Sequence, residues 1–388
     1  MENDIKRYRV LAVQRFKAGE SPESICTSLG KSKVWLYKWI KRYNDDPSWC
    51  EDHSCRPFVT PNRTPAEIEE IVKMVRLGLY NQDLFCGAEA ILWEMEDLGA
   101  KPLPSVRTIN RILARNELTH RRTGKYEAKG TAYPVLPSAL PNQTHQADLV
   151  GPCYLKGSVR FYSLNIVNTA TVRCGLYPSL SKSGQAIING FWDAWKRMGI
   201  PERIQVDNAM SFFGSPIHPR GMGPLIRLCL HHGVEPWFIP MAEPWRNGMI
   251  ENFNDRYQRM FLGKVIMASE NDLKAHSLEF EERHNSRYRY SKLKGDTPLK
   301  ALAASRVTLR FPKEEELPSH RLKKPEIGKY HVVRLIRSDL KLNIFGECFA
   351  APPETMLEYV VATIDVKEQK LKLFMDNKRI KEFDYKLR

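Results

Sequence analysis

Three acidic residues occupy positions where carboxylate chemistry is expected. Asp148 lies inside an otherwise apolar segment with the pattern of a strand, and Asp207 directly follows another such segment. Glu251 lies in the first turns of a segment with the pattern of a helix. An unpaired carboxylate in apolar surroundings protonates or destabilises the fold, so these acids need partners. Carboxylate oxygens are the ligands that Mg²⁺ prefers, and we therefore predict that the three residues converge on a divalent metal site.

The segments around the acids alternate between strand and helix patterns. Runs rich in aliphatic and aromatic residues predict strands, whereas apolar residues at helical spacing predict helices. The resulting order predicts a mixed sheet with helices packed on its faces. The expected strands are THQADLV, RFYSLNIVN, RCGLYPSL, 203–206 and 235–239, and the expected helices are 183–198, 222–232 and 247–261.

Four stretches of this region carry a family resemblance. They are HQADLVG around Asp148, IQVDNAM around Asp207, PWRNGMIENFNDRYQR around Glu251, and HNSRYRYSKLKGDTP further downstream. In this order they resemble the D-D-E transposase and retroviral-integrase superfamily, most closely the integrase-core transposases of bacterial insertion sequences. The resemblance implies a ribonuclease H-like catalytic core over residues 143–305. It also implies that the three acids are catalytic and bind two Mg²⁺ (or Mn²⁺) ions per active site.

The same resemblance implies a reaction and its partners. The expected function is that of a DNA transposase, which cleaves transposon ends and transfers their 3′-hydroxyl groups into target DNA. The expected partner is double-stranded DNA, bound by a homo-oligomer that is a dimer or larger. Two other functions stay open: a transposase-derived DNA-binding regulator without catalysis, and a ribonuclease H-like nuclease that only hydrolyses, because a fold alone does not fix the reaction.

Two features depart from the family pattern. The interval between Asp207 and Glu251 (251 − 207 = 44 residues) is longer than in typical retroviral integrases, and PIHPRGMG looks like the inserted loop. Gln258 stands where relatives often place a lysine that contacts the DNA end. Arg256 and Arg259 are the candidates to replace that lysine.

Several polar residues near the acids have alternative interpretations. Glu243, in MAEPWRNG, is an alternative third acid, but we prefer Glu251 because a helix is a more rigid support than a proline-containing loop. Asn208 and Asn254 are expected to orient the acids or to contact a phosphate. His145, three residues before Asp148, is expected to pack or to form hydrogen bonds rather than act as a base.

The N-terminal residues predict a helix-turn-helix domain over 1–45. Gly19 ends a first helix, Ser21 caps a short second helix that Gly30 closes, and Ser32 opens a third. The third helix is basic and is expected to enter the major groove. The residues predicted to contact DNA there are Lys31, Lys33, Lys38, Lys41 and Arg42.

A second helical DNA-binding domain is expected over 62–118. Thr64 to Glu67 has the spacing of a capping box, and Ser105 is expected to cap a final helix that carries Arg107, Arg111 and Arg115 on one face. The segment 119–142 is basic and then rich in proline, which predicts an extended linker lying along DNA. Its predicted DNA contacts are Arg121 and Arg122.

The C-terminal residues 327–388 contain repeated short apolar-polar alternations separated by turns. This pattern predicts a small β-barrel domain, and it resembles the barrel that follows the catalytic core in phage Mu-type transposases. Whether such a barrel contacts DNA or protein stays open at this point, because its charges are mixed.

Composition agrees with a nucleic-acid partner. Lys and Arg number 60 against 45 Asp and Glu, which gives a net charge of +15 and favours a polyanion. No apolar run approaches the ~20 residues of a membrane-spanning helix, and MENDIKRYRV lacks the core of a signal peptide. We therefore expect a cytoplasmic, nucleoid-associated bacterial protein without a membrane partner. Eight cysteines without Cys-x-x-Cys spacing predict no disulfide framework, and Cys50, His53 and Cys55 lack the second ligand pair of a zinc site.

Overall fold

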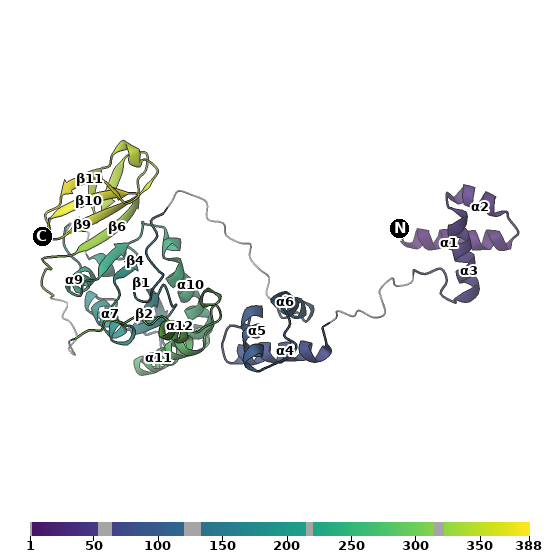
Figure 1. The fold of residues 1–388 in the computed structure, drawn as a ribbon, viewed down its shortest axis with the longest axis horizontal. Coiled ribbons are helices and arrows are strands. Elements are labelled where there is room, and N and C mark those ends of the chain that lie inside the picture. The colour runs from purple at the N-terminus through teal and green to yellow at the C-terminus, as the bar shows by residue number, and fades with distance from the viewer. Residues whose placement is uncertain (1, 53–63, 120–132, 215–219, 314–321) are drawn as a thin grey trace. The chain divides into compact units, whose positions relative to one another are not determined.

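The chain forms two compact units in the computed structural model (Figure 1), Met1–Arg63 and Thr64–Arg388. The structure describes residues 2–52, 64–119, 133–214, 220–313 and 322–388. The seven cysteines within these ranges are all free thiols, and His53 and Cys55 lie outside them.

The first unit is a three-helix domain. Its helices are α1 (Glu2–Lys17), α2 (Pro22–Leu29) and α3 (Lys33–Asp45). The predicted caps are confirmed: the Ser21 hydroxyl accepts the Ser24 N–H and the Ser32 hydroxyl accepts the Trp35 N–H. A small core holds the helices together, and its fully buried residues are Ala12, Ile25 and Leu36.

The second unit begins with three further helices, α4 (Ala66–Asn81), α5 (Ala88–Asp97) and α6 (Val106–Arg115). Ser105 caps α6 as predicted. The predicted capping box at Thr64 is wrong, because Pro65 takes the N-cap position and no side chain bonds to the first turn. Spacing alone could not reveal this, since a proline fixes its own backbone angle and sets where the helix starts.

These three helices share a hydrophobic core with the rest of the unit. The ring of Phe85, in the turn after α4, packs edge-on against the rings of Tyr288 and Tyr290. The Tyr288 hydroxyl donates to the backbone carbonyl of Asp83. Gly295, in the LKGDTP stretch, lies so close to the indole of Trp93 on α5 that a Cβ atom there would clash. The helices are therefore part of the larger unit.

The predicted mixed sheet is confirmed. Strands β1 (Thr144–Tyr154), β2 (Arg160–Asn168) and β3 (Cys174–Ser179) form an antiparallel meander, and β4 (Arg203–Val206) and β5 (Glu235–Phe238) run parallel to β1. Each β4 or β5 strand follows a helix, as the alternation predicts.

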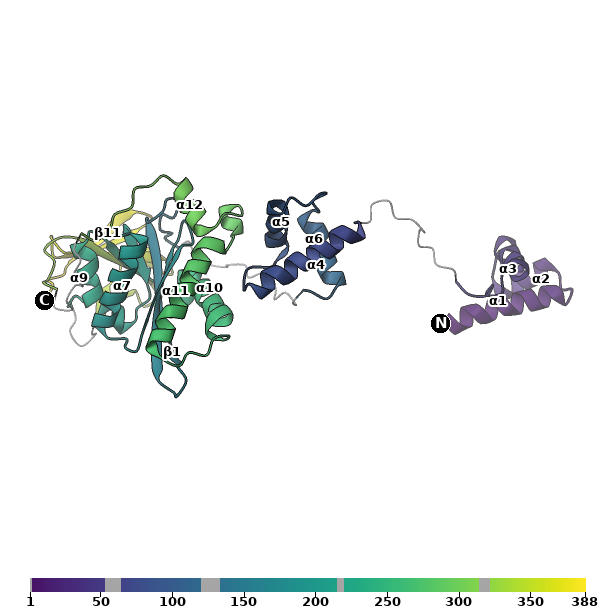
Figure 2. The same cartoon turned by 90° about the horizontal axis from the view of Figure 1, so that it is seen from below.

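Helices cover both faces of this sheet (Figure 2). One face packs against α7 (Gly184–Met198) and α9 (Pro224–His231), and the other against α10 (Gly248–Tyr257) and α11 (Glu270–Arg287). Two separate clusters of buried apolar side chains result. The remaining short elements are α8 (Met210–Phe213), η1 (Pro244–Asn247), the π-helical η2 (Gln258–Leu262), η3 (Ser291–Leu293), α12 (Pro298–Ala304) and η4 (Pro353–Thr355).

The C-terminal strands extend the core sheet, so the predicted separate β-barrel is wrong. Strand β6 (Lys329–Leu335) pairs in parallel with β5, with Trp237 opposite His331 and Phe238 opposite Val332. The sheet has nine strands in the order β11-β10-β9-β6-β5-β4-β1-β2-β3 and does not close. The added strands are β9 (Tyr359–Asp365), β10 (Lys370–Met375) and β11 (Lys378–Asp384), while β7 (Lys341–Ile344) and β8 (Glu347–Ala350) form a two-stranded sheet.

The continuous sheet explains this outcome. Val332 on β6 is fully buried and belongs to the same apolar cluster as Ile204 on β4 and Leu225 on α9. Period-two alternation identifies strands, but it does not identify their partners, because pairing between β5 and β6 joins segments far apart in sequence.

Deleting residues 327–388 should destabilise the rest of the unit Thr64–Arg388. The deletion exposes the edge of β5 and the apolar side chains that β6 covers, a loss of several kcal/mol. Each kcal/mol shifts the unfolding midpoint of a domain of this size by about 2–4 °C, so we expect that midpoint to fall by about 10 °C or more. Thermal unfolding followed by circular dichroism measures it. Deletion of residues 1–63, a separate unit, is the control and should leave that midpoint unchanged. An unchanged midpoint after the C-terminal deletion would show an independent domain.

Candidate active site

The three acids lie in one region beside the paired strands β1 and β4, near enough for the charges of Asp148 and Asp207 to act on Glu251. The parallel pairing of β1 with β4 ends with Gln146 opposite Gln205. Asp148 follows Gln146 by two residues on β1 and so points to the same side of the strand, and Asp207 directly follows the end of β4. Glu251 occupies the first turn of α10, on the face of the sheet that this helix covers.

Side-chain amides anchor the start of α10 to the two strands. The Gln146 Oε1 atom accepts hydrogen bonds from the backbone N–H groups of Met249 and Ile250, each at 3.0 Å. The Gln205 amide donates to the backbone carbonyl of Arg246 at 2.8 Å. Gln146 therefore satisfies two N–H groups that a helix start leaves without partners, and it fixes the position of Glu251 relative to Asp148.

Sequence reasoning missed both glutamines. The available signal was a polar residue in an apolar strand, two positions before each acid and so on the same face of the strand.

The electrostatics of the acids match their crowding. Burial raises the pKa of Asp148, and the nearby Asp207 charge raises it further, against hydrogen bonds from Leu149 N–H and the Asn254 amide that lower it. Burial also raises the pKa of Asp207. The pKa of Glu251 is raised by burial and then by the charges of Asp148 and Asp207. The charges of neighbouring carboxylates therefore raise the pKa of both Asp148 and Glu251.

No cation of the described chain compensates these charges. Within the described ranges, none of the three carboxylates forms an ion pair with Lys, Arg or His. Like charges held together without a counter-charge are a site for a bound cation, and oxygen donors suit a hard divalent ion. The donor chemistry and the charge of the site therefore fit Mg²⁺.

The side chains do not form a complete coordination shell as they stand. Across the residues that the structure describes, no three His, Cys, Asp or Glu side chains are close enough to hold one metal ion. Binding an ion between them therefore requires the carboxylates to approach one another further.

The alternative third acid, Glu243, has a different role. Its Oε2 atom accepts hydrogen bonds from the Arg246 side chain at 3.0 Å and from the Tyr359 hydroxyl at 2.7 Å. Arg246 also lies over the rings of Tyr133 and Tyr359. Glu243 is thus neutralised in a cluster with the C-terminal strands, whereas Glu251 interacts with the two aspartates.

Two other predicted residues are engaged within the protein. The Asn208 amide donates to the carbonyl of Ile239 and its oxygen accepts from Arg334. Asn254 is buried, and its amide donates to Asp148 Oδ2 at 2.7 Å. The prediction for His145 is confirmed: it is fully buried beside Asn142, and burial lowers its pKa to about 3, so the ring is neutral.

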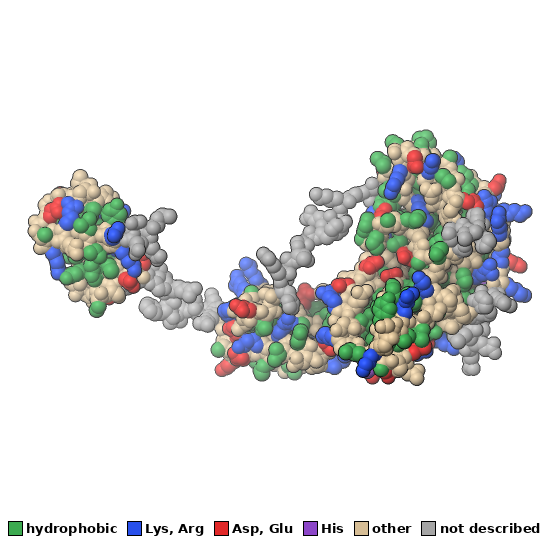
Figure 3. All heavy atoms as spheres, turned by 180° about the vertical axis from the view of Figure 1, so that it is seen from behind, with side chains coloured by type: hydrophobic (Ala, Val, Ile, Leu, Met, Phe, Trp, Pro, Cys, Tyr) green, Lys and Arg blue, Asp and Glu red, His purple; other side chains and the backbone are tan. Residues whose placement is uncertain are grey.

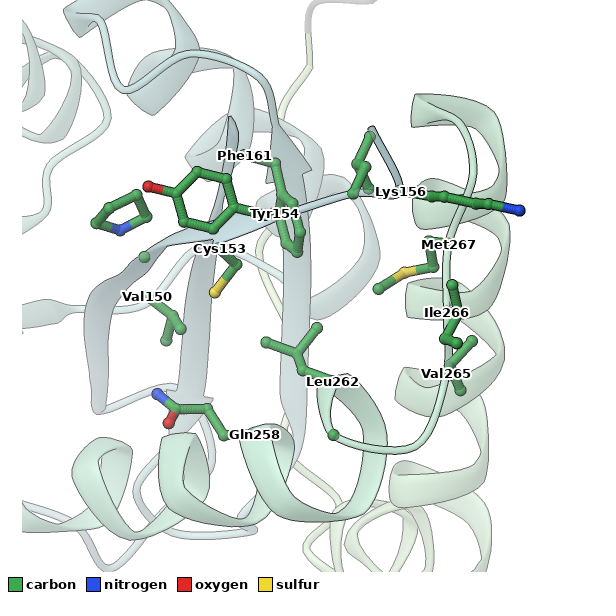
Figure 4. Close-up of a pocket in the computed structure, with 14 residues that line it drawn as sticks. Val150, Cys153, Tyr154, Lys156, Phe161, Gln258, Leu262, Val265, Ile266 and Met267 are labelled. Carbon is green, nitrogen blue, oxygen red and sulfur yellow. The ribbon is translucent and has the colours of Figure 1, made fainter. Parts of the chain in front are cut away.

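A cavity of about 720 Å³ is lined by residues that follow Asp148 and Glu251 in the chain (Figure 4). One wall is the continuation of β1 from Val150 to Lys156, and the other consists of Gln258 and Leu262 on η2 with the segment Val265 to Met267. Val150 is two residues after Asp148 and Gln258 is seven residues after Glu251, but none of the three acids lines the cavity. The Gln258 amide points into this cavity between apolar side chains (Figure 4).

The two arginines near Gln258 differ in exposure. Arg256 lies over the rings of Phe85 and Tyr290 and donates to the Tyr290 hydroxyl. The Arg259 side chain is 70% exposed and pairs with Asp255. Of the two, Arg259 is the more exposed, and both line a pocket beside α4 and α5.

The predicted basic residues of the helical regions lie mostly at the surface. Lys31, Lys33, Lys38 and Lys41 of the first unit are exposed, and Lys33 forms an ion pair with Glu23. Arg107 and Arg111 on α6 are exposed, while Arg115 pairs with Glu69. Arg42 lies partly buried over the Trp39 ring, and Arg121 and Arg122 fall outside the described residues.

The exposed stripe of α3 is not purely basic. Val34 is 81% exposed and Tyr37 is 50% exposed on the same helix. Figure 3 likewise shows Lys and Arg side chains among hydrophobic and acidic ones on the face that it draws.

Comparison with known proteins supports the helix-turn-helix prediction. Residues 6–48 match the model of the homeodomain-like domain family. The comparison with curated proteins finds no match. No helix in the described ranges is long and apolar enough to span a membrane.

Solved structures of retroviral integrases resemble parts of the chain. The HTLV-2 integrase catalytic core domain in complex with magnesium, in its dimeric form, is 17% identical and covers 43% of this chain and 99% of that chain, with a TM-score of 0.31. The simian T-cell lymphotropic virus intasome, in complex with PP2A regulatory subunit B56 gamma, is 13% identical and covers 81% of this chain and 96% of that chain, with a TM-score of 0.37.

Replacing Glu251 with Gln should stabilise the metal-free protein at neutral pH. The folded state raises the pKa of Glu251, so the ionised carboxylate opposes folding and stability falls as pH rises through that pKa. Glu251→Gln removes this charge, and we expect a higher unfolding midpoint at pH 7 in EDTA but little difference near pH 4. Thermal unfolding across this pH range measures the effect. A lower midpoint for the variant at pH 7 would contradict the repulsion described above.

Proposed function

We propose that this chain is a DNA transposase of the integrase type, with Asp148, Asp207 and Glu251 as its catalytic residues. The observation that carries the proposal is the group of three carboxylates in which Asp207 raises the pKa of Asp148 and both aspartates raise the pKa of Glu251, with no described cation to neutralise them and with Gln146 bonded to the start of α10. Half-buried like charges oppose folding, so their presence points to a functional site.

The three carboxylates would hold Mg²⁺ or Mn²⁺, two ions per active site. When bound, such ions would lower the pKa of the attacking water or hydroxyl group and stabilise the negative charge on the phosphate oxygens. The chain itself supplies the rigid placement of its donors, through the amides of Gln146 and Gln205 and the paired strands β1 and β4.

The proposed reaction has two steps at phosphorus. Water attacks the phosphodiester at a transposon end, and the bond to the 3′ oxygen breaks to leave a 3′-hydroxyl and a 5′-phosphate. That 3′-hydroxyl then attacks a phosphodiester of target DNA, so one P–O bond forms as another breaks and no external energy source is needed.

The remaining parts of the chain would bind DNA. Lys31, Lys33, Lys38 and Lys41 on and beside α3 suit a helix in the major groove, and Arg107 and Arg111 on α6 suit phosphate contacts. We propose double-stranded DNA as partner, a dimer or larger assembly that joins two ends, and a location in the bacterial cytoplasm at the nucleoid.

Asp148→Asn should abolish cleavage and joining while DNA binding is retained. A bound divalent ion contributes several kcal/mol to the transition state, and each ~1.4 kcal/mol is tenfold in rate, so we expect a loss of roughly 10³-fold or more. The assay combines Mg²⁺, labelled terminal repeats and a plasmid target, with gel shift as the measure of binding.

Asp376→Asn is the matched control, because Asp376 has a positive φ of 48° that Asn tolerates and lies in the β10–β11 turn. It should keep full activity. Strand-transfer products of the wild type would exclude the hydrolytic nuclease, and a wild type that binds DNA without cutting it would favour the regulator.

Lys41→Ala should weaken DNA binding through one lost phosphate contact. Lys41 is exposed on α3, and each neutralised phosphate contributes about 0.9 to the slope of log affinity against log salt. We expect the slope to fall by about that amount, as measured by fluorescence anisotropy over a salt series. Lys274→Ala on α11, where Lys274 pairs with Glu270, is the control. An unchanged slope would remove α3 from the interface.

A further inference from the structure

Strand β2 carries two polar side chains that are completely buried. Ser163 and Asn165 have no exposed surface, although the strand around them is apolar. Burial of an amide or hydroxyl is unfavourable unless hydrogen bonds replace those to water. Asn165 stands opposite Asp148 in the β1–β2 register, which places this buried pair next to the candidate active site.

A chain of hydrogen bonds runs from these residues to the catalytic carboxylate. The Ser163 hydroxyl donates to Asn165 Oδ1 at 2.7 Å, and the Asn165 amide donates to Asn254 Oδ1 at 2.8 Å. The Asn254 amide in turn donates to Asp148 Oδ2 at 2.7 Å. The other carboxylate oxygen, Asp148 Oδ1, accepts the N–H of Leu149 at 2.8 Å.

The direction of each bond in this chain is determined by its neighbours. An ionised Asp148 carboxylate can only accept, so the Asn254 NH₂ group faces it and the Asn254 oxygen is left to accept from the Asn165 NH₂ group. Asn254 must therefore turn its oxygen toward Asn165 and its NH₂ group toward Asp148. If the Asn254 amide were reversed, its NH₂ group would face the NH₂ group of Asn165, and its oxygen would face the Asp148 carboxylate.

We propose that Ser163 and Asn165 are positioning residues that fix the orientation of the Asp148 carboxylate through Asn254 and thereby set the affinity of the site for Mg²⁺. This inference rests on the proposed function. With one donor on each oxygen, the carboxylate cannot rotate freely, and its remaining lone pairs stay directed at the site it shares with Asp207 and Glu251.

The choice of cation distinguishes positioning from general damage. Mg²⁺ demands near-ideal octahedral geometry, whereas Ca²⁺ accepts six to eight oxygens in flexible arrangements. A carboxylate that has lost its orientation should therefore lose Mg²⁺ affinity more than Ca²⁺ affinity. A merely unstable fold would weaken both equally.

The experiment measures the rise in unfolding temperature of the full-length protein over titrations with Mg²⁺ and with Ca²⁺, without DNA. For Asn165→Leu, which keeps the approximate volume and removes the donor, we expect Mg²⁺ affinity to fall about 10- to 100-fold and Ca²⁺ affinity to fall clearly less. Ser163→Ala is a milder second variant, which removes only the hydrogen bond that the Asn165 oxygen accepts, and we expect about a threefold loss for Mg²⁺.

Asn168→Ala is the matched control. Asn168 is a buried Asn at the end of the same strand, and it bonds to Asn142 and to the turn at Ala170 but not to the chain that reaches Asp148. It should lower the unfolding temperature in EDTA without changing the Mg²⁺ to Ca²⁺ affinity ratio.

The possible results separate the two proposals. A wild type that binds neither cation would refute the proposed function. A wild type that binds Mg²⁺, with both Asn165→Leu and Ser163→Ala retaining its Mg²⁺ to Ca²⁺ affinity ratio, would leave that function standing and overturn the positioning role.

Discussion

Repulsion of Asp148 and Glu251 by neighbouring carboxylates is the constraint around which the unit Thr64–Arg388 is arranged. Burial raises the pKa of each carboxyl group, and the charges of both aspartates raise the pKa of Glu251 further. The ionised carboxylates therefore oppose folding at neutral pH. The rest of the unit must supply the stability that this edge of the sheet loses. Trp192 and Trp195 of α7 and the apolar strands beneath them form one large buried cluster that does so.

Rigid attachment keeps the acids together despite their repulsion. Polar side chains placed inside apolar strands provide it, and each is satisfied by a specific partner. Gln146 bonds to the first turn of α10, Gln205 bonds to the segment before it, and Asn165 bonds to Asn254 on the next turn. A buried amide with a single satisfying arrangement favours that arrangement over any other, which is how these residues specify the position of Glu251 and the orientation of Asp148.

The sequence predicted those features that depend on local patterns. Caps at Ser21, Ser32 and Ser105 follow from residue types at helix starts, and the strands and helices of the core follow from apolar periodicity. The positions of the acids relative to these elements also followed, because each acid is adjacent to its element in the chain.

Features that depend on distant pairings were not predictable in the same way. Nothing in residues 329–335 shows that β6 joins β5 rather than closing a barrel, because an alternating strand has the same pattern in both cases. The link from Asn165 to Asn254 spans 89 residues, and only the folded chain brings the two amides together. A buried Asn or Gln in a strand marks that such a partner exists without identifying it.

The extended sheet changes the role of the C-terminal strands. Arg334 on β6 donates to the side chain of Asn208, the residue after Asp207, and to the carbonyl of Ile239 at the end of β5. Its burial, which lowers the pKa to about 10, is tolerable because these bonds and one to the carbonyl of Asn343 satisfy the guanidinium.

Tyr359 on β9 contacts the segment that precedes α10. It bonds to Glu243 and Arg246, in the segment that leads into α10. The C-terminal strands therefore hold both the end of β4, which carries Asp207, and the approach to the helix that carries Glu251. A separate DNA-binding module would leave these two segments unsupported, so the C-terminal strands are better understood as part of the scaffold that keeps the three carboxylates in place.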